Sequence, residues 1–166
     1  NVKVLNTEIA NIGMRWTSGT TRWWGNGIAL GGGGYSTGGS RVYVENCYIH
    51  DCTMHAVDHE PGKDSYIVDT YLDCSTMYTD TGSNSKAPWT VGYLAWSGKS
   101  STGNTLRHCY VRSETGWTCV YNGSTTVNNT ATYNTFKYHS GGAGCVASGD
   151  ASLANQTISN NSEEAI

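Results

Sequence analysis

The sequence has few charges, few prolines and no long apolar run. Charged residues make up 14% of the 166 residues and the formal net charge is -3, so the chain lacks the basic patch that binds nucleic acid. No apolar stretch approaches the roughly 20 residues that a membrane-spanning helix needs. We therefore expect neither a nucleic-acid partner nor a membrane span.

The residues that build helical bundles are also scarce. Ala, Leu, Glu and Lys are too sparse for a bundle, and 2 prolines stand against 21 glycines. The abundance of Ser, Thr and Asn favours strands and turns. The aromatic residues comprise 6 Trp and 11 Tyr but a single Phe, and such amphipathic rings suit half-exposed binding surfaces better than a dry core.

Similar short phrases recur along the chain, beginning at Leu5, Val44, Val68, Arg107 and Ala154: "LNTEIANIG", "VENCYIHDC", "VDTYLDCS", "RHCYVRSE" and "ANQTISNN". Their alignment gives an apolar column that we expect to be buried in one stack: Ile9, Ile49, Leu72, Val111, Phe136 and Ile158. Three residues earlier lies a bend column, in which Tyr133 is a departure: Asn6, Asn46, Asp69, His108, Tyr133 and Asn155. Self-similarity at a period of roughly 20–30 residues indicates a solenoid.

The repeat predicts coils of strand rather than helix. The chain has too little Leu for leucine-rich repeats, and it shows no 3.6-residue period. Stacked strand coils would place equal positions about 4.7–4.9 Å apart, and Asn at a tight bend tolerates a left-handed backbone. A second strand per coil is predicted at Gly27, Ala56, Thr90, Thr118 and Gly144, in the segments "GIALG", "AVDHE", "TVGYL", "TCVYN" and "GCVAS".

Two insertions border this second strand, "GMRWTSGTTRWWGNG" with "GGGGYSTGGS" after it and "YTDTGSNSKAPWTVGYLAWSGKSSTGN". The N-x-x-I phrases, the bend Asn and the segment "AVDHEPGKDSYIVDTYLDC" resemble the right-handed parallel β-helix of pectate-lyase-like proteins. That superfamily includes polysaccharide lyases, glycoside hydrolases and phage tailspikes, so the resemblance is specific for fold and weak for function.

We therefore predict an all-β fold, a right-handed single-stranded parallel β-helix of about five to six coils with two long loop insertions. Residues 1–166 would form a single β-helix domain. Because the chain begins with Asn1 rather than Met and its first residues already read as a strand, we expect it to be a fragment of a longer chain.

The densest group of functional side chains lies in "HDCTMHAVDHEPGKD", which begins at His50. If Val57 faces the core, Asp58 and Glu60 face outward together, with Cα atoms about 6.6–6.8 Å apart. Paired carboxylates can act as the acid and the nucleophile or base on a glycosidic bond. The alternative is a solvated acidic strand. The same register turns His59 inward, either as a core histidine or because the strand is irregular.

The tryptophans are the second candidate group. Five lie in the insertions, where no coil core requires them: Trp16, Trp23, Trp24, Trp89 and Trp96. Exposed flat rings stack on the apolar faces of sugars, whereas the alternative is that the insertions bury their own rings. Together with the carboxylates they would form a groove. No spacing matches a recognised metal site, so we predict no metal or cofactor; Ca²⁺ is an option only if the protein is a lyase.

The 6 cysteines include no C-x-x-C pair, which argues against a ribbon-type zinc site. Cys119 and Cys145 occupy equal positions on neighbouring coils, and Cys52 and Cys74 nearly equal ones. The coil spacing would allow a disulfide, but stacked side chains point parallel, which is poor geometry for a bridge. We expect mostly free, buried thiols.

Two functions follow from these patterns. The first is an extracellular β-helix that recognises a polysaccharide or other glycan and cleaves it, as a hydrolase or lyase, in a surface groove. The second is a non-catalytic structural or receptor-binding module, such as a phage tailspike, a tail fibre or a surface adhesin, with a homotrimer expected for a tailspike. Either protein would be extracellular, at a cell surface or on a virion.

Overall fold

The computed structural model describes residues 2–12, 26–29, 41–52, 55–59, 63–74, 93–96, 101–113, 117–122, 125–138, 143–148 and 152–165. Over these residues the chain is nearly all strand, interrupted by the short 3-10 helix η1 (Leu153–Asn155). A helix with the length and hydropathy needed to cross a membrane does not occur in this described part.

The strands form three parallel sheets. Sheet A contains β1 (Val2–Leu5), β4 (Val42–Glu45), β7 (Tyr66–Val68), β10 (Thr105–Arg107), β13 (Thr130–Thr132) and β16 (Thr157–Ser159). Sheet B contains β2 (Glu8–Ile12), β5 (Tyr48–Cys52), β8 (Tyr71–Cys74), β11 (Tyr110–Ser113), β14 (Thr135–Tyr138) and β17 (Ser162–Ala165). Sheet C contains β3 (Ile28–Ala29), β6 (Val57–His59), β9 (Tyr93–Trp96), β12 (Trp117–Asn122) and β15 (Ala143–Ser148).

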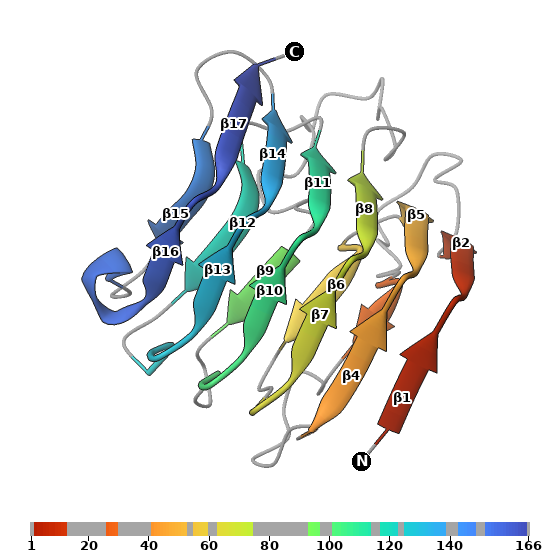
Figure 1. Cartoon of the computed structure of the whole chain (residues 1–166), viewed down its shortest axis with the longest axis horizontal. Helices are drawn as coiled ribbons and strands as arrows, with labels where there is room; N and C mark the ends of the chain where they lie inside the picture. Colours follow the sequence, from red (N-terminus) through yellow and green to blue (C-terminus); the bar gives the residue numbers. More distant parts are fainter. Residues whose placement is uncertain are drawn as a thin grey trace, which may run out of the picture.

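Each coil of the chain contributes its strands to successive sheets, so neighbours within a sheet come from successive coils (Figure 1). The fold is therefore a parallel β-helix of about six coils, as the repeat predicts. Sheet C corresponds to the predicted second strand, and its register joins Ile28, Val57, Tyr93, Cys119 and Cys145. The alignment is two residues off in the third copy, where the predicted segment from Thr90 would place Val91 rather than Tyr93 in this column. The bend divides each recurring phrase into two strands, which gives three strands per coil rather than two.

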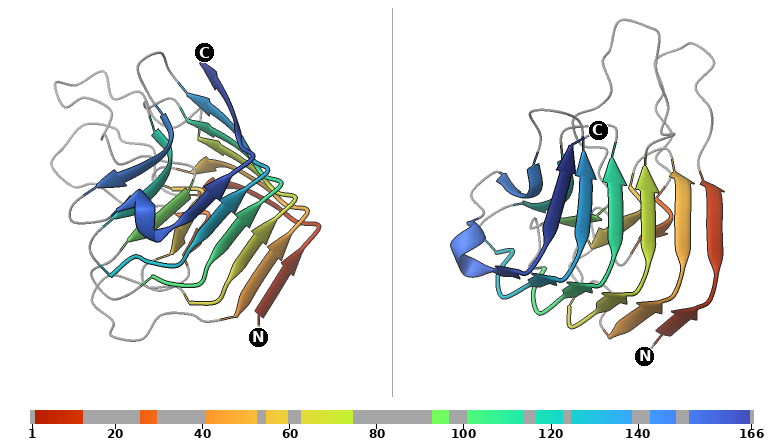
Figure 2. Two further views of the ribbon diagram at one scale, coloured as in Figure 1. Left: turned by 60° about the vertical axis from the view of Figure 1, so that its left-hand side comes forward. Right: turned by 45° about the horizontal axis from the view of Figure 1, so that its top comes forward.

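The bends line up along one edge of the solenoid, between sheets A and B (Figure 2). Their residues all adopt left-handed φ angles of 49–58°: Asn6, Asn46, Asp69, His108, Tyr133 and Asn160. The predicted bend column is thus confirmed for its first five members. It is wrong for Asn155, which belongs to η1. The last phrase also contains the pair Asn160 and Asn161, and the true bend follows β16, as it follows the sheet A strand of every other coil.

The apolar column is confirmed for Ile9, Ile49, Leu72, Val111 and Phe136, which are in register in sheet B. All of these except Ile9, in the first coil, are fully buried. The prediction is wrong for Ile158, which is only partly buried and pairs with Ala131 in sheet A. Glu163 occupies the position next to Phe136 instead. The shifted bend explains both errors, because it moves the last phrase from sheet B into sheet A.

Buried amide side chains connect the coils at the turn that enters sheet A. Asn104 Oδ1 accepts a hydrogen bond from Ser65 N at 3.2 Å, Asn129 Oδ1 accepts from Asn104 N at 3.0 Å, and Gln156 Oε1 accepts from Asn129 N at 3.0 Å. This amide ladder satisfies backbone groups that the strands leave unpaired, which buried turns require. It gives part of the high Asn content a structural role.

One bend residue suggests a stabilising substitution. Tyr133 has φ 58° and its side chain is 56% exposed, so an aromatic residue occupies a conformation that costs L-residues other than Gly, Asn or Asp about 1–2 kcal/mol. We expect Tyr133→Asn to raise the free energy of unfolding by about 0.5–1 kcal/mol, measured by urea denaturation. Tyr133→Ala, which keeps the strain, should not stabilise the protein. Equal stabilities of Tyr133→Asn and Tyr133→Ala would contradict this account.

Candidate functional site

Asp58 lies in β6 on the side of sheet C that faces away from the core. Val57 belongs to the buried core, as the predicted register requires, but Asp58 is itself only 8% exposed. Its Oδ2 accepts a hydrogen bond from Asn26 Nδ2 at 2.8 Å. Val120, in the same outward column through Leu94, is also buried. Asp58 is therefore not a solvated strand carboxylate, and the alternative of an exposed acidic strand is wrong for it.

His59 is a core histidine in a regular strand. It is fully buried, and β6 pairs with β3 on one side and β9 on the other. Burial lowers the pKa of its imidazole to about 3, so the ring is neutral in the folded protein at ordinary pH. This result decides between the two sequence interpretations of His59.

The structure does not describe the side chains of the other predicted site residues. Glu60 and the tryptophans Trp16, Trp23, Trp24 and Trp89 lie outside the described residues, as do most residues of the two insertions. The prediction that Trp96 lies in a loop insertion is wrong, because it is the last residue of strand β9, where its backbone is in register with Asn122. The aromatic groove and the Asp58–Glu60 pair therefore stay predictions.

The cysteines whose side chains the structure describes are free thiols, as the stacking argument predicts. Cys47, Cys52, Cys109 and Cys119 are buried and Cys145 is half-buried. Cys119 and Cys145 are register partners on neighbouring coils. Burial raises the pKa of the Cys52 thiol to about 11 and that of Cys109 to about 12. Burial also raises the pKa of Cys119. Because the thiolate is the reactive form, Cys52, Cys109 and Cys119 should be chemically inert in the folded protein.

This inertness can be measured. In the native protein at about pH 8 we expect a thiol reagent to label Cys52, Cys109 and Cys119 much more slowly than a free thiol of ordinary pKa. In denaturant without reductant, at least four thiols should react rapidly, as counted by mass spectrometry. Recovery of disulfide-linked peptides, or rapid native labelling of Cys109, would contradict the expectation.

The structure assembles a surface that the sequence analysis missed, on the outward side of sheet B. Tyr48, Tyr71 and Tyr110 are register partners on successive coils. The ring centroids of Tyr48 and Tyr71 are 5.1 Å apart with edge-to-face geometry, and those of Tyr71 and Tyr110 are 4.6 Å apart and stacked. We call these residues the tyrosine ladder. Its signal was present in the sequence, because the phrases of three successive coils carry Tyr immediately before the core residues Ile49, Leu72 and Val111.

The next outward column along sheet B is charged. It contains His50, Asp73 and Arg112 as register partners, and Arg112 Nη1 lies 4.0 Å from Asp73 Oδ2. Burial and then the nearby Asp73 carboxylate raise the pKa of Tyr71 to about 12. The Tyr71 phenol is therefore protonated at ordinary pH and keeps its O–H group for hydrogen bonding.

A shallow hollow of about 300 Å³ lies at the first end of the tyrosine ladder. We call it the Tyr48 hollow, and its lining comprises Asn6, Thr7, Glu8, Asn46, Cys47 and Tyr48. Asn46 Nδ2 donates to Asn6 Oδ1 at 2.7 Å, so the two bend amides are held together. Tyr48 is 41% exposed. The hollow thus combines an accessible aromatic ring with amide, hydroxyl and carboxylate groups.

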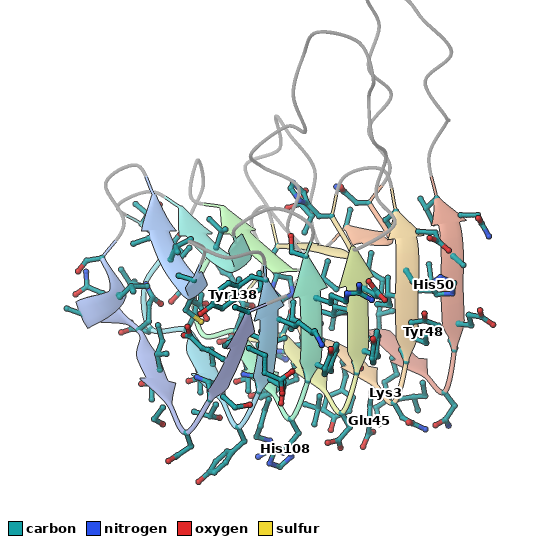
Figure 3. The ribbon with its side chains drawn as sticks, turned by 90° about the horizontal axis from the view of Figure 1, so that it is seen from above. Lys3, Glu45, Tyr48, His50, His108 and Tyr138 are labelled. Carbon is teal, nitrogen blue, oxygen red and sulfur yellow. The ribbon has the colours of Figure 1, made fainter. Side chains whose placement is uncertain are left out.

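His50 contacts two residues that line this hollow, Tyr48 and Glu8. Its ring stacks on Tyr48 with centroids 3.9 Å apart (Figure 3). Its Nε2 lies 2.9 Å from Glu8 Oε1 and its Nδ1 lies 2.8 Å from Asp51 Oδ2. Burial lowers the pKa of His50, but its hydrogen bonds to Glu8 and Asp51 outweigh that effect, and the net pKa is raised. We call Glu8, His50 and Asp51 the His50 clasp.

Comparison with known proteins gives no relative for the chain: no protein-family model, curated protein or solved structure matches it. Within the described residues, no three or more His, Cys, Asp or Glu side chains are grouped so that they could hold a metal ion. What the protein binds must therefore be inferred from its own surface. On the described residues the chain is an all-β protein with the parallel β-solenoid fold.

Proposed function

We propose that the chain is a carbohydrate-recognising β-helix that works outside the cell, at a cell surface or on a virion. The single observation that carries this proposal is the Tyr48 hollow, where an exposed aromatic ring lies among polar groups that can bond sugar hydroxyls. The resemblance of the repeat to right-handed β-helices of the pectate-lyase-like type agrees with this class of ligand, since that superfamily includes proteins that act on polysaccharides, but it is specific for the fold and adds little weight on function.

The chemistry of the hollow suits a sugar. Sugar rings have apolar C–H faces and a rim of hydroxyls, so they are bound by aromatic rings together with a few placed polar groups. A volume of about 300 Å³ is at the lower end of ligand sites, which favours one sugar unit at a time. Because the tyrosine ladder continues from Tyr48 along the coil axis, a polysaccharide could extend over the phenols of Tyr71 and Tyr110.

Cleavage is the finer form of this proposal. It assigns the acid pair to Asp58 and Glu60 and an aromatic groove to Trp16, Trp23, Trp24, Trp89 and Trp96, beside sheet C. The burial of Asp58 and its hydrogen bond from Asn26 support a carboxylate with a fixed position, which acid–base chemistry needs. If the protein does not cleave the glycan, the same surface would serve a non-catalytic structural or receptor-binding module. Such a module would be homotrimeric if it is part of a tailspike.

Binding can be tested by one substitution. We expect Tyr48→Ala to weaken the affinity for a recognised oligosaccharide about tenfold, or about 1.4 kcal/mol, because it removes the ring on which the sugar lies. The measurement is calorimetry with cellohexaose, xylohexaose, mannohexaose, chitohexaose and an oligogalacturonide. Tyr66→Ala is the matched control, since Tyr66 is 43% exposed but lies on sheet A, away from the hollow.

The outcomes separate the forms of the proposal. Equal affinities of Tyr48→Ala and Tyr66→Ala would remove the hollow as the site, and no binding across the panel would remove glycan recognition by this surface. Release of reducing ends from the same panel, lost in Asp58→Asn and Glu60→Gln, would establish cleavage. Binding without release would establish the non-catalytic module.

A further inference from the structure

His50 connects two coils and the hollow at once. Glu8 belongs to β2 of the first coil, whereas Tyr48, His50 and Asp51 belong to β5 of the second. Glu8 is 68% exposed at its side chain, and its contact with His50 is the hydrogen bond that draws it toward β5. The described contact that links the Glu8 side chain to β5 is thus the one with His50.

The two contacts of His50 require two N–H donors. A protonated imidazole donates from both ring nitrogens, but a neutral imidazole has one N–H and one lone pair. Since carboxylates lie 2.9 Å from Nε2 and 2.8 Å from Nδ1, a neutral ring would set a lone pair against one of them. Asp51 is adjacent in sequence and held by the strand, so the exposed Glu8 is the group that would be released.

We propose that His50 is a positioning residue that makes glycan binding at the Tyr48 hollow depend on pH: the imidazolium holds Glu8 in the wall of the hollow, and the neutral ring releases it. This inference depends on the proposed function of the hollow. Affinity is highest when His50 is charged and falls as the ring loses its proton.

The groups immediately around His50 all favour its protonated form. On its own strand these are Asp51 and the Tyr48 ring, from β2 it meets Glu8, and from β8 its register partner is Asp73. Arg112 stands one coil further, beside Asp73. The immediate neighbours are thus carboxylates and a ring face, all of which favour the imidazolium.

The direction of the pH effect follows. The pKa of His50 is raised above its ordinary value of 6.5, so the clasp is fully formed below about pH 6.5. It is lost as the pH rises through the raised pKa. We expect the affinity for the hexasaccharide that binds best to fall by roughly three- to tenfold across this change.

The experiment compares the wild type with His50→Gln and Asp51→Asn from about pH 5.5 to 8.5, a range above the ordinary carboxylate pKa values. His50→Gln, which has no titrating ring, should bind weakly without that pH dependence. Asp51→Asn should move the midpoint of the affinity change to lower pH, because one of the carboxylates that raise the His50 pKa becomes neutral. Asn fits this position, since Asp51 has φ 52° and its counterpart Asn11 in the first coil has φ 57°.

A second measurement does not need a glycan. NMR titration of the His50 ring should give a midpoint above 6.5 in the wild type and a lower midpoint in Asp51→Asn. A wild-type midpoint at or below 6.5, or affinity with the same pH profile in His50→Gln, would overturn the inference. If no panel glycan binds at any pH, the proposed function fails and the glycan part of the inference with it, while a raised midpoint would still establish the His50 clasp.

Discussion

Replacement of Phe136 by alanine is expected to lower the free energy of unfolding by about 3–5 kcal/mol. Phe136 is fully buried in the sheet B column, in register with Val111 of the preceding coil. It packs so closely that a Cβ added at Gly144 would lie 2.6 Å from Phe136 Cδ2. Because Val111 is held by its own strand ladder and Gly144 has no side chain, little can collapse into the cavity, which places the cost toward the upper part of this range.

Urea denaturation followed by circular dichroism measures this loss. Thr135→Ala is the matched control, since Thr135 precedes Phe136 in β14 but faces outward and is half-buried. The control should change stability by no more than about 0.5 kcal/mol. A loss below about 1 kcal/mol for Phe136→Ala would mean that the last coils contribute little to the cooperative unit.

The second large effect is expected at Asn129, in the amide ladder. Its Oδ1 accepts hydrogen bonds from Asn104 N and Nδ2, each at 3.0 Å, and its Nδ2 donates to Ser101 O and Gln156 Oε1, each at 3.1 Å. The side chain is fully buried. Alanine would remove these four side-chain hydrogen bonds at a largely buried site, so we expect a loss of about 2–4 kcal/mol.

Two further variants make the Asn129 result specific. Asn155→Ala removes an exposed amide at the same end of the solenoid and should change the unfolding free energy by less than about 0.5 kcal/mol. Asn129→Asp keeps the acceptor oxygens but loses the donors and buries a charge, so it should be at least as damaging as alanine. Similar stabilities of Asn129→Ala and Asn155→Ala would show that the amide ladder contributes little to the stability of the fold.

The errors in the predicted columns have a common physical origin. A phrase such as "ANQTISNN" offers Asn155 and Asn160 as bends, and local sequence does not distinguish them. The choice is made by cross-coil hydrogen bonds: Tyr133 N donates to Ser159 O and Asn128 N donates to Asn155 O. With that register, Ile158 joins sheet A and Glu163 follows Phe136. A register difference of this kind moves every side chain of the coil.

Four features could be predicted from the sequence, because each depends on a pattern that the coils repeat. They are the repeat period, the left-handed bends from Asn6 to Tyr133, the strands of sheet C and the free thiols. The Tyr48 hollow and the His50 clasp could not be predicted, since Glu8 and His50 are separated by 42 positions and meet only when the coils stack. The burial of Asp58 could not be predicted for the same reason, since its hydrogen-bond partner Asn26 lies 32 positions away. Alternation along a strand says which side of the sheet a side chain faces, whereas what covers that side is decided by chain packed over it from elsewhere.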